Sequence, residues 1–119
     1  MGQVRGEVKN DQMVINLSGH VDSNNSAQIE TEIIDSIAGN ENLDLILDIE
    51  DLAYISSAGL RVILRLRKNH PELCIKNACS EVYEILDMTG FTQMMQVDKA
   101  YRVVSIEGAE VIGQGANGT

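Results

Sequence analysis

Aromatic residues are scarce in this chain of 119 residues, and tryptophan is absent. Phe, Tyr and Trp together make up 3% of the sequence, while 44% of its residues are apolar. A core of this composition must consist mainly of Ile, Leu, Val and Met side chains. The apolar content and the length are sufficient for one soluble domain with a single core.

Cysteine is also rare, with Cys74 and Cys79 as its two representatives. Their spacing matches no zinc or redox motif, and His20 and His70 lie far from them in the sequence. We therefore expect two free thiols, no bound metal and no cofactor.

Basic residues are outnumbered by acidic ones, and the formal net charge is −9. Nucleic acids and anionic membranes both require a cationic surface, so the charge argues against either as a partner. One helical stretch does concentrate positive charge. A solvated helix face is its simpler interpretation, and a docking stripe for an acidic partner is the alternative. The basic residues of this stretch are Arg61, Arg65, Arg67 and Lys68.

Long apolar runs are absent as well. None approaches the roughly 20 residues that cross a bilayer, and no apolar segment follows Met1. The sequence therefore predicts a cytoplasmic protein.

The stretch 43–68 carries the most informative pattern. Its first part, 43–49, is an apolar run that is too short for a helix and is typical of a buried strand. A loop with several carboxylates is expected next, followed by two serines and a helix. The carboxylates are those of Asp48, Glu50 and Asp51.

Ser56 and Ser57 stand directly before that helix. A serine at a helix start accepts a hydrogen bond from a backbone N–H that otherwise lacks a partner, so a capping role is the simplest one. The free N–H groups and the positive end of the helix dipole also favour a phosphate there. Phosphorylation would add a charge of roughly −2 beside the carboxylates and change what this surface can dock.

The segment 45–64, which reads YISSAGL at 54–60, resembles the signature of the STAS domain family, the bacterial anti-sigma-factor antagonists and their relatives. In that family the loop before the second helix reads Asp-Ser-Ser/Thr-Gly-Leu, and a partner protein kinase phosphorylates its first hydroxyl residue. The resemblance implies that Ser57 is this residue, followed by Gly59 and Leu60.

Two positions depart from the family pattern. Ser56 stands where the family has its aspartate, and Ala58 stands where it has its second hydroxyl. These departures keep an acceptor at Ser57 and leave Ser56 as a competing site.

The resemblance implies a module for bacterial signal transduction and transcription regulation. Such a module binds an anti-sigma factor that is also a serine protein kinase, and phosphorylation of Ser57 releases it. The residues implied to form the partner-binding surface are Asp22, Ser23, Asp48, Ser56, Ser57, Ala58, Gly59, Leu60 and Arg61.

The beginning of the chain predicts a hairpin. Apolar residues alternate with others in the segment 13–17, and the residues 10–12 are typical of a turn after the weaker pattern of 3–9. Gly19 is expected to end this hairpin.

A helix is predicted next, with apolar residues at helical spacing over 27–38. Asp22 or Ser23 is expected to cap it. The segment 19–23 also resembles the corresponding part of STAS domains, where this loop lies close to the phosphorylation loop and forms part of the kinase-facing surface.

Further elements follow Pro71, which disfavours helix in the residue before it. The pattern predicts a short strand at 73–75, a helix that Ser80 caps and Gly90 ends, and a final strand at 93–97.

The run 84–91 resembles the end of the third helix of anti-sigma-factor antagonists. Together these patterns predict an α/β fold, a single STAS-like domain over residues 1–104. Its mixed sheet has an antiparallel opening hairpin and then parallel β-α units, with helices packed on it.

Residues 105–119 have a different composition and are expected to form a tail or linker. A G-x-G-x-x-G motif at 113–118 follows the strand-like 110–112 and resembles the opening of the nucleotide-covering loop of protein-kinase-like phosphotransferases. The tail is thus also interpreted as the start of a truncated domain of that kind.

Three functions remain open at this point. The first is the phosphorylated interaction module described above. The second is a regulatory STAS domain that controls an attached phosphotransferase by self-association or ligand binding, without phosphorylation of its own. The third, a hydrolase that uses Ser57, is the least favoured because no general base, metal or nucleophile elbow accompanies this serine. We therefore do not expect an enzyme.

Overall fold

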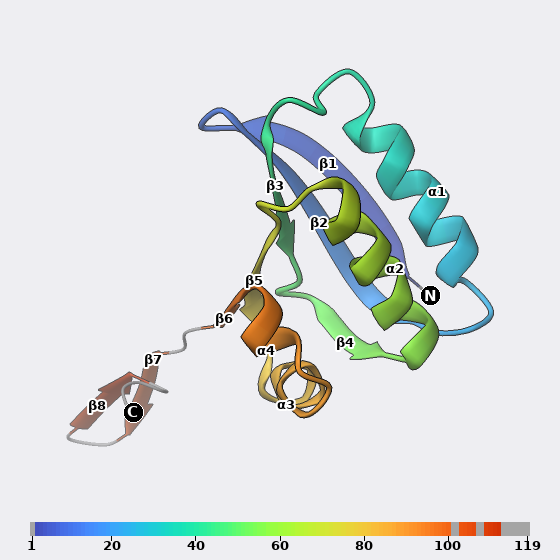
Figure 1. Ribbon diagram of the computed structural model, residues 1–119. Helices are drawn as coiled ribbons and strands as arrows, with labels where there is room; N and C mark the ends of the chain where they lie inside the picture. The colour runs from blue at the N-terminus through green and yellow to red at the C-terminus, as the bar shows by residue number, and fades with distance from the viewer. Residues whose placement is uncertain (1, 101–102, 107–108, 113–119) are drawn as a thin grey trace.

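The computed structural model describes residues 2–100, 103–106 and 109–112, which form a mixed α/β fold (Figure 1). The main sheet consists of β1 (Gln3–Lys9), β2 (Gln12–Val21), β3 (Asp44–Asp48), β4 (Leu52–Ile55), β5 (Cys74–Ala78) and β6 (Gln96–Lys99). The helices are α1 (Ser26–Ile37), α2 (Ser57–Asn69), α3 (Ser80–Met88) and α4 (Phe91–Met94). The strand order is β1-β2-β3-β5-β6, with β4 paired to β2. Only β1 and β2 are antiparallel in this sheet, so the predicted fold class is confirmed.

The predicted opening hairpin is confirmed. Asn10 and Asp11 form its two-residue turn with φ angles of 54° and 63°. Positive φ at both central residues is what a type I′ turn requires, and Asn and Asp tolerate it better than most side chains do. The turn sets a register in which Val8 lies opposite Met13.

The prediction that Gly19 ends this hairpin is confirmed, because β1 and β2 pair only up to Ser18, although the strand β2 itself continues to Val21. Gly19 has a φ of 83°, and the register of β2 against β4 shifts between Gly19 and His20. A glycine accepts this conformation without strain, so it bends the strand here instead of terminating it. The result is that β2 pairs with β3 along its first part and with β4 along its last part.

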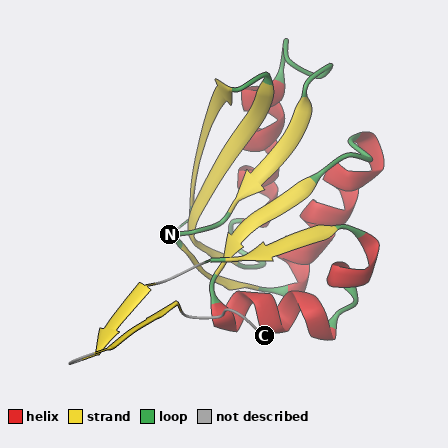
Figure 2. Cartoon of the chain, turned by 90° about the vertical axis from the view of Figure 1, so that its left-hand side faces the viewer, coloured by secondary structure: helices red, strands yellow, loops and turns green. Residues whose placement is uncertain are grey.

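The core lies between the sheet and the helices, with α1 and α2 side by side on one face. Figure 2 shows the helices gathered on one side of the strands. Alternate residues of β2 point into this core, and their neighbours face the opposite, open side of the sheet. The main contributors from β2, α1 and α2 are Met13, Ile15, Leu17, Ile29, Ile33, Ile37, Val62, Ile63 and Leu66.

The start of α1 differs from the prediction. The helix begins at Ser26 with Asn25 as its N-cap residue, and neither Asp22 nor Ser23 caps it. Instead, the Asp22 carboxylate accepts hydrogen bonds from the backbone N–H groups of Asn24 and Asn25, at 2.8 and 3.2 Å. Asp22 therefore organises the turn that precedes the helix, a local bond that aspartate forms readily.

The elements from α3 to β6 also differ from the prediction. Ser80 is the first residue of α3 and not its cap, which is Cys79. The first two residues of the strand predicted at 93–97 belong instead to the short helix α4, whose first residue, Phe91, is buried and packs against the core. The strand expected at 93–97 is β6, which begins at Gln96.

Beyond this sheet, β7 (Val103–Ile106) and β8 (Ala109–Ile112) pair in an antiparallel manner as a separate two-stranded sheet. The domain boundary after residue 104 falls inside β7 and stays a prediction. The glycine motif at 113–118 lies outside the described residues.

Candidate functional site

The strand β4 occupies the place where the sequence predicted a loop. Leu52 and Ile55 of this strand are buried, while Ala53 and Tyr54 are exposed. Four extended residues span roughly 13 Å. The carboxylates of Glu50 and Asp51 therefore lie at one end of β4, and the serines lie at the other (Figure 1). The expectation that these carboxylates flank the serines is wrong.

Ser56 is the N-cap of α2. Its backbone N–H donates to the carbonyl oxygen of Val21 at 2.8 Å. Its side-chain oxygen accepts from the N–H of Gly59 at 3.4 Å, a long capping bond. The capping hydroxyl expected at this helix start is therefore that of Ser56, which is half-buried.

Ser57 is the first residue of α2 and is exposed. A side chain at this position does not take the capping bond, because Ser56 already makes it. The Ser57 hydroxyl thus lies on the surface beside the free N–H groups of the first helical turn. The structure separates the roles of the two serines, which the sequence left open.

Gly59 and Leu60 lie inside the molecule. A Cβ atom on Gly59 would lie 2.6 Å from Cγ1 of Ile55 and 2.8 Å from Cγ1 of Val21. Only a residue without a side chain lets α2 approach β2 and β4 this closely. Leu60 and Gly59 therefore hold the helix start in place and are covered by their own fold.

The loop after β2 lies beside this helix start. Val21 is the partner of Ile55 in the parallel pair of β2 and β4, so Asp22 and Ser56 follow neighbouring strand ends. The Asp22 carboxylate also lies 3.5 Å from Nε2 of His20, an ion pair when the imidazole is protonated. The proximity of this loop to the serines, which the family resemblance implied, is present in the structure.

Asp48 lies apart from the serines, at the end of β3. Its Oδ1 atom accepts hydrogen bonds from the N–H of Glu50 at 3.1 Å and from Nδ2 of Asn77 at 3.2 Å. Asp48 is paired with Asn16 of β2, whereas the serines follow β4, which pairs with the last residues of β2. Its carboxylate thus supports the turn after β3.

Arg61 is exposed and lies one helical turn after Ser57. Residues four apart share a helix face, with about 5–6 Å between their Cβ atoms. Tyr54, which no sequence pattern assigned to the site, is 50% exposed and pairs with His20 across the two strands. An exposed tyrosine in a strand next to the serines was the available signal, but the strand itself was not recognised.

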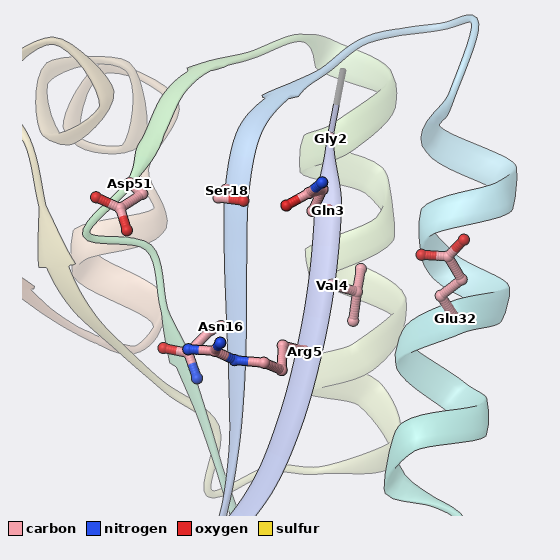
Figure 3. A pocket seen from close by; sticks show the side chains of 8 residues that line it. All are labelled: Gly2, Gln3, Val4, Arg5, Asn16, Ser18, Glu32 and Asp51. Atoms are coloured by element: carbon pink, nitrogen blue, oxygen red, sulfur yellow. The ribbon is translucent and has the colours of Figure 1, made fainter.

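A hollow of about 550 Å³ lies along β1 and the neighbouring part of β2 (Figure 3). Residues of β1 and β2 line it together with Glu32 and Asp51, and most of the lining groups are polar. It includes none of the residues predicted for the partner-binding surface. The hollow is therefore distinct from the start of α2.

The described part of the chain contains no group of three metal-binding side chains. Cys74 and Cys79 are both free thiols, as predicted. Burial raises the pKa of the Cys74 thiol. Over the same residues, no helix is both long and apolar enough to pass through a lipid bilayer.

The fold and the helix start together define a small α/β domain with an exposed serine at the end of β4. Comparison with known proteins places it more narrowly. The family model described as STAS domain matches residues 3–105. The chain belongs to the STAS domain family.

Individual relatives agree with this assignment. BtrV of Bordetella bronchiseptica, named as a candidate anti-sigma factor antagonist, is 37% identical over 85 residues, which are 68% of this chain and 72% of that protein. An anti-sigma factor antagonist from Mycobacterium paratuberculosis has a similar structure, with a TM-score of 0.73 and 15% identity over 82% of this chain and 86% of that one.

The unphosphorylated anti-sigma factor antagonist SpoIIAA is also similar, with a TM-score of 0.63 and 19% identity over 91% of both chains. The phosphorylated form of SpoIIAA from Bacillus matches with a TM-score of 0.56 and 18% identity, over 91% of this chain and 95% of that one. At these identities the solved structures show the common fold alone.

Proposed function

We propose that this domain is an anti-sigma factor antagonist whose binding to an anti-sigma factor is switched by phosphorylation of Ser57. The carrying observation is the division of roles at the start of α2. Ser56 uses its hydroxyl as the helix cap, and Ser57 presents its own hydroxyl on the surface. Ser57 is therefore the serine that a kinase can reach without unfolding the helix start.

The position of Ser57 favours a phosphate for electrostatic reasons. A helix N-terminus carries a partial positive charge and free N–H groups, which stabilise an anion. Arg61, a cationic residue, lies one turn further along the same helix. Both groups stabilise the modified form, so phosphorylation changes the surface without distorting the fold.

The proposed docking surface consists of the exposed and half-exposed groups around this serine. It includes Asp22, Ser23, Ser56, Ala58 and Arg61. Adding about two negative charges at its centre opposes docking, because the phosphate must lose its water and meet the partner's groups in an interface shaped for a hydroxyl. The unmodified form is the one that binds.

The relatives support this proposal from a second direction. BtrV is named for anti-sigma factor antagonism, and SpoIIAA bears the same description and exists in unphosphorylated and phosphorylated forms. The proposed partner here is an anti-sigma factor that also acts as a serine protein kinase. The proposed site of action is the bacterial cytoplasm.

Incubation with the cognate anti-sigma factor kinase and ATP tests the proposal, with intact mass as the readout. We expect the addition of one phosphate to the wild type and none to Ser57→Ala. The matched control is Ser56→Asn, which removes the other hydroxyl but keeps a side chain that caps helices as well as serine does. This control should accept one phosphate as the wild type does.

Loss of the phosphate in Ser56→Asn, with retention in Ser57→Ala, would assign the acceptor to Ser56. No mass change in the wild type would remove the phosphorylation switch altogether. Both results are readable because the two variants keep the helix start folded, which circular dichroism verifies.

A further inference from the structure

The strand β1 forms a free edge of the main sheet. Within the described residues it pairs with β2 on one side, and no strand lies on its other side. The outward N–H and C=O groups of an edge strand are a template for pairing with another strand. What pairs with this edge depends on the side chains that β1 presents.

The side chains of β1, which reads QVRGEVK, are complementary to themselves in the antiparallel direction. When two copies of the strand are aligned with Gly6 opposite Gly6, Arg5 of each copy lies opposite Glu7 of the other. Gln3 then lies opposite Lys9. Opposite charges that face each other across two strands stabilise the pair, and here the symmetry produces each pair twice.

The valines of β1 are complementary in the same alignment. Val4 and Val8 lie opposite the core residues Leu17 and Met13, so both are on the side of the sheet that α1 covers. Val4 packs against the core, but Val8 is 54% exposed. Val4 of a second copy would lie directly opposite Val8 and cover it.

The two kinds of side chain lie on opposite sides of the strand. Figure 3 shows Arg5 and Gln3 on the open side of β1, with Val4 turned toward α1. A second copy added at this edge therefore pairs opposite charges on the open side of the sheet and pairs valine with valine on the core side. This alternation matches the pleat of a continuous sheet.

The helix α1 covers the same face of β1. A Cβ atom on Gly6 would lie 3.0 Å from Cβ of Ser36, so this small residue of α1 faces the centre of the strand. In a continuous sheet the two copies of α1 would lie on one face, the face that carries the valines.

The charges of β1 also select the register. Charged residues on an edge ordinarily discourage pairing. A shift by two residues in one direction places Arg5 opposite Arg5, and a shift in the other direction places Glu7 opposite Glu7. Like charges directly opposite each other are destabilising, so the alignment at Gly6 is the favoured one.

We propose that two copies of this domain associate through β1, in an antiparallel pair centred on Gly6, to form one continuous sheet across a two-fold axis. The proposal is independent of Ser57 and of any anti-sigma factor. A single short strand pair gives an interface below roughly 1,200 Å², so the dimer is a weak one.

Sedimentation equilibrium at concentrations on the order of 10 to 500 µM suits an affinity of this class. We expect the wild type to pass from monomer to dimer over this range. Arg5→Glu and Glu7→Arg each turn both ion pairs into like-charge pairs, and each should weaken the dimer about tenfold or more. Both positions are exposed, so circular dichroism should show unchanged folds.

A mixture of Arg5→Glu and Glu7→Arg provides the decisive test of the pairing. One strand then carries two glutamates and the other two arginines, so a heterodimer regains both ion pairs. The double variant Arg5→Glu/Glu7→Arg keeps the wild-type net charge and should dimerise like the wild type. A wild type that stays monomeric, single variants that dimerise undiminished, or a mixture that remains monomeric would each overturn the proposal.

Discussion

Gly59 carries no side chain, yet its position decides how closely α2 approaches the sheet. A methyl group there would meet Ile55 and Val21 at 2.6 and 2.8 Å, well inside van der Waals contact. At an exposed position inside a helix, a change from glycine to alanine stabilises the folded protein by about 1 kcal/mol. At this site the steric clash opposes that gain.

We expect Gly59→Ala to destabilise the domain by about 1 to 3 kcal/mol, as overpacking of a core does. Urea unfolding measures the change. In an Ile55→Ala background, which makes room for the methyl group, the same change should cost less. A stabilised Gly59→Ala variant would show that α2 shifts freely and that the contact does not constrain the helix start.

The serines illustrate how much of the site the sequence predicts at this scale. Their location at a helix start follows from the hydroxyl pair and from the helical pattern after Leu60. Which serine caps the helix does not follow, because both have a capping side chain. Only the backbone path decides this, through the bond from Ser56 to Val21 and the helical conformation of Ser57.

At the scale of elements, an ion pair between Glu30 and Arg65, with two hydrogen bonds, joins α1 and α2. Nε and Nη2 of Arg65 donate to the two carboxylate oxygens of Glu30 at 2.8 and 2.7 Å. The hydrogen bonds from Arg65 hold the pKa of Glu30 below its ordinary value, although desolvation opposes them. The folded domain therefore binds a proton at this glutamate less readily than the unfolded chain does.

This difference contributes stability above the ordinary glutamate pKa of roughly 4.3, and the contribution is lost as the pH falls through the lower folded value. An NMR titration of the Glu30 carboxyl carbon should show the lowered pKa. Arg65→Gln should return it toward the ordinary value, and the control Arg61→Gln should leave it unchanged. Equal pKa values in the wild type and in Arg65→Gln would refute the role of this pair.

The elements themselves were predicted unevenly. The hairpin and the end of α2 before Pro71 follow from local turn chemistry and were correct. The strand β4 was missed because its pattern of burial, with Leu52 and Ile55 inside and two exposed residues between them, lacks the alternation of a strand. It is held by pairing with the end of β2 beyond Gly19, a long-range contact that no local pattern records.

At the scale of the whole molecule, the family resemblance and the alternation of strands and helices were enough to predict the mixed sheet. They placed the loop of Asp22 beside the serines, which the structure bears out through the pair of Val21 and Ile55. The pattern of residues 43–57 also placed three carboxylates beside the serines, but Glu50 and Asp51 lie at the far end of β4 and Asp48 lies at the end of β3. The prediction failed because the residues between the carboxylates and the serines form an extended strand, which separates its two ends more than a compact loop does.

The net charge of −9 bears on the proposed switch at this scale. An acidic domain is attracted to a basic partner surface, and long-range attraction accelerates encounter. Phosphorylation makes the domain more acidic, so long-range attraction does not explain release. The proposed release must therefore come from the contact itself, where the phosphate replaces a hydroxyl.

The most direct measurement is the affinity of the anti-sigma factor for the domain with and without phosphoserine at position 57, determined by titration calorimetry at one salt concentration. Site-specific incorporation of phosphoserine keeps the comparison independent of any kinase. We expect the unmodified domain to bind about tenfold or more tightly than the phosphorylated one, because the phosphate must lose its water in an interface shaped for a hydroxyl. Equal affinities, or tighter binding of the phosphorylated domain, would contradict the proposed switch.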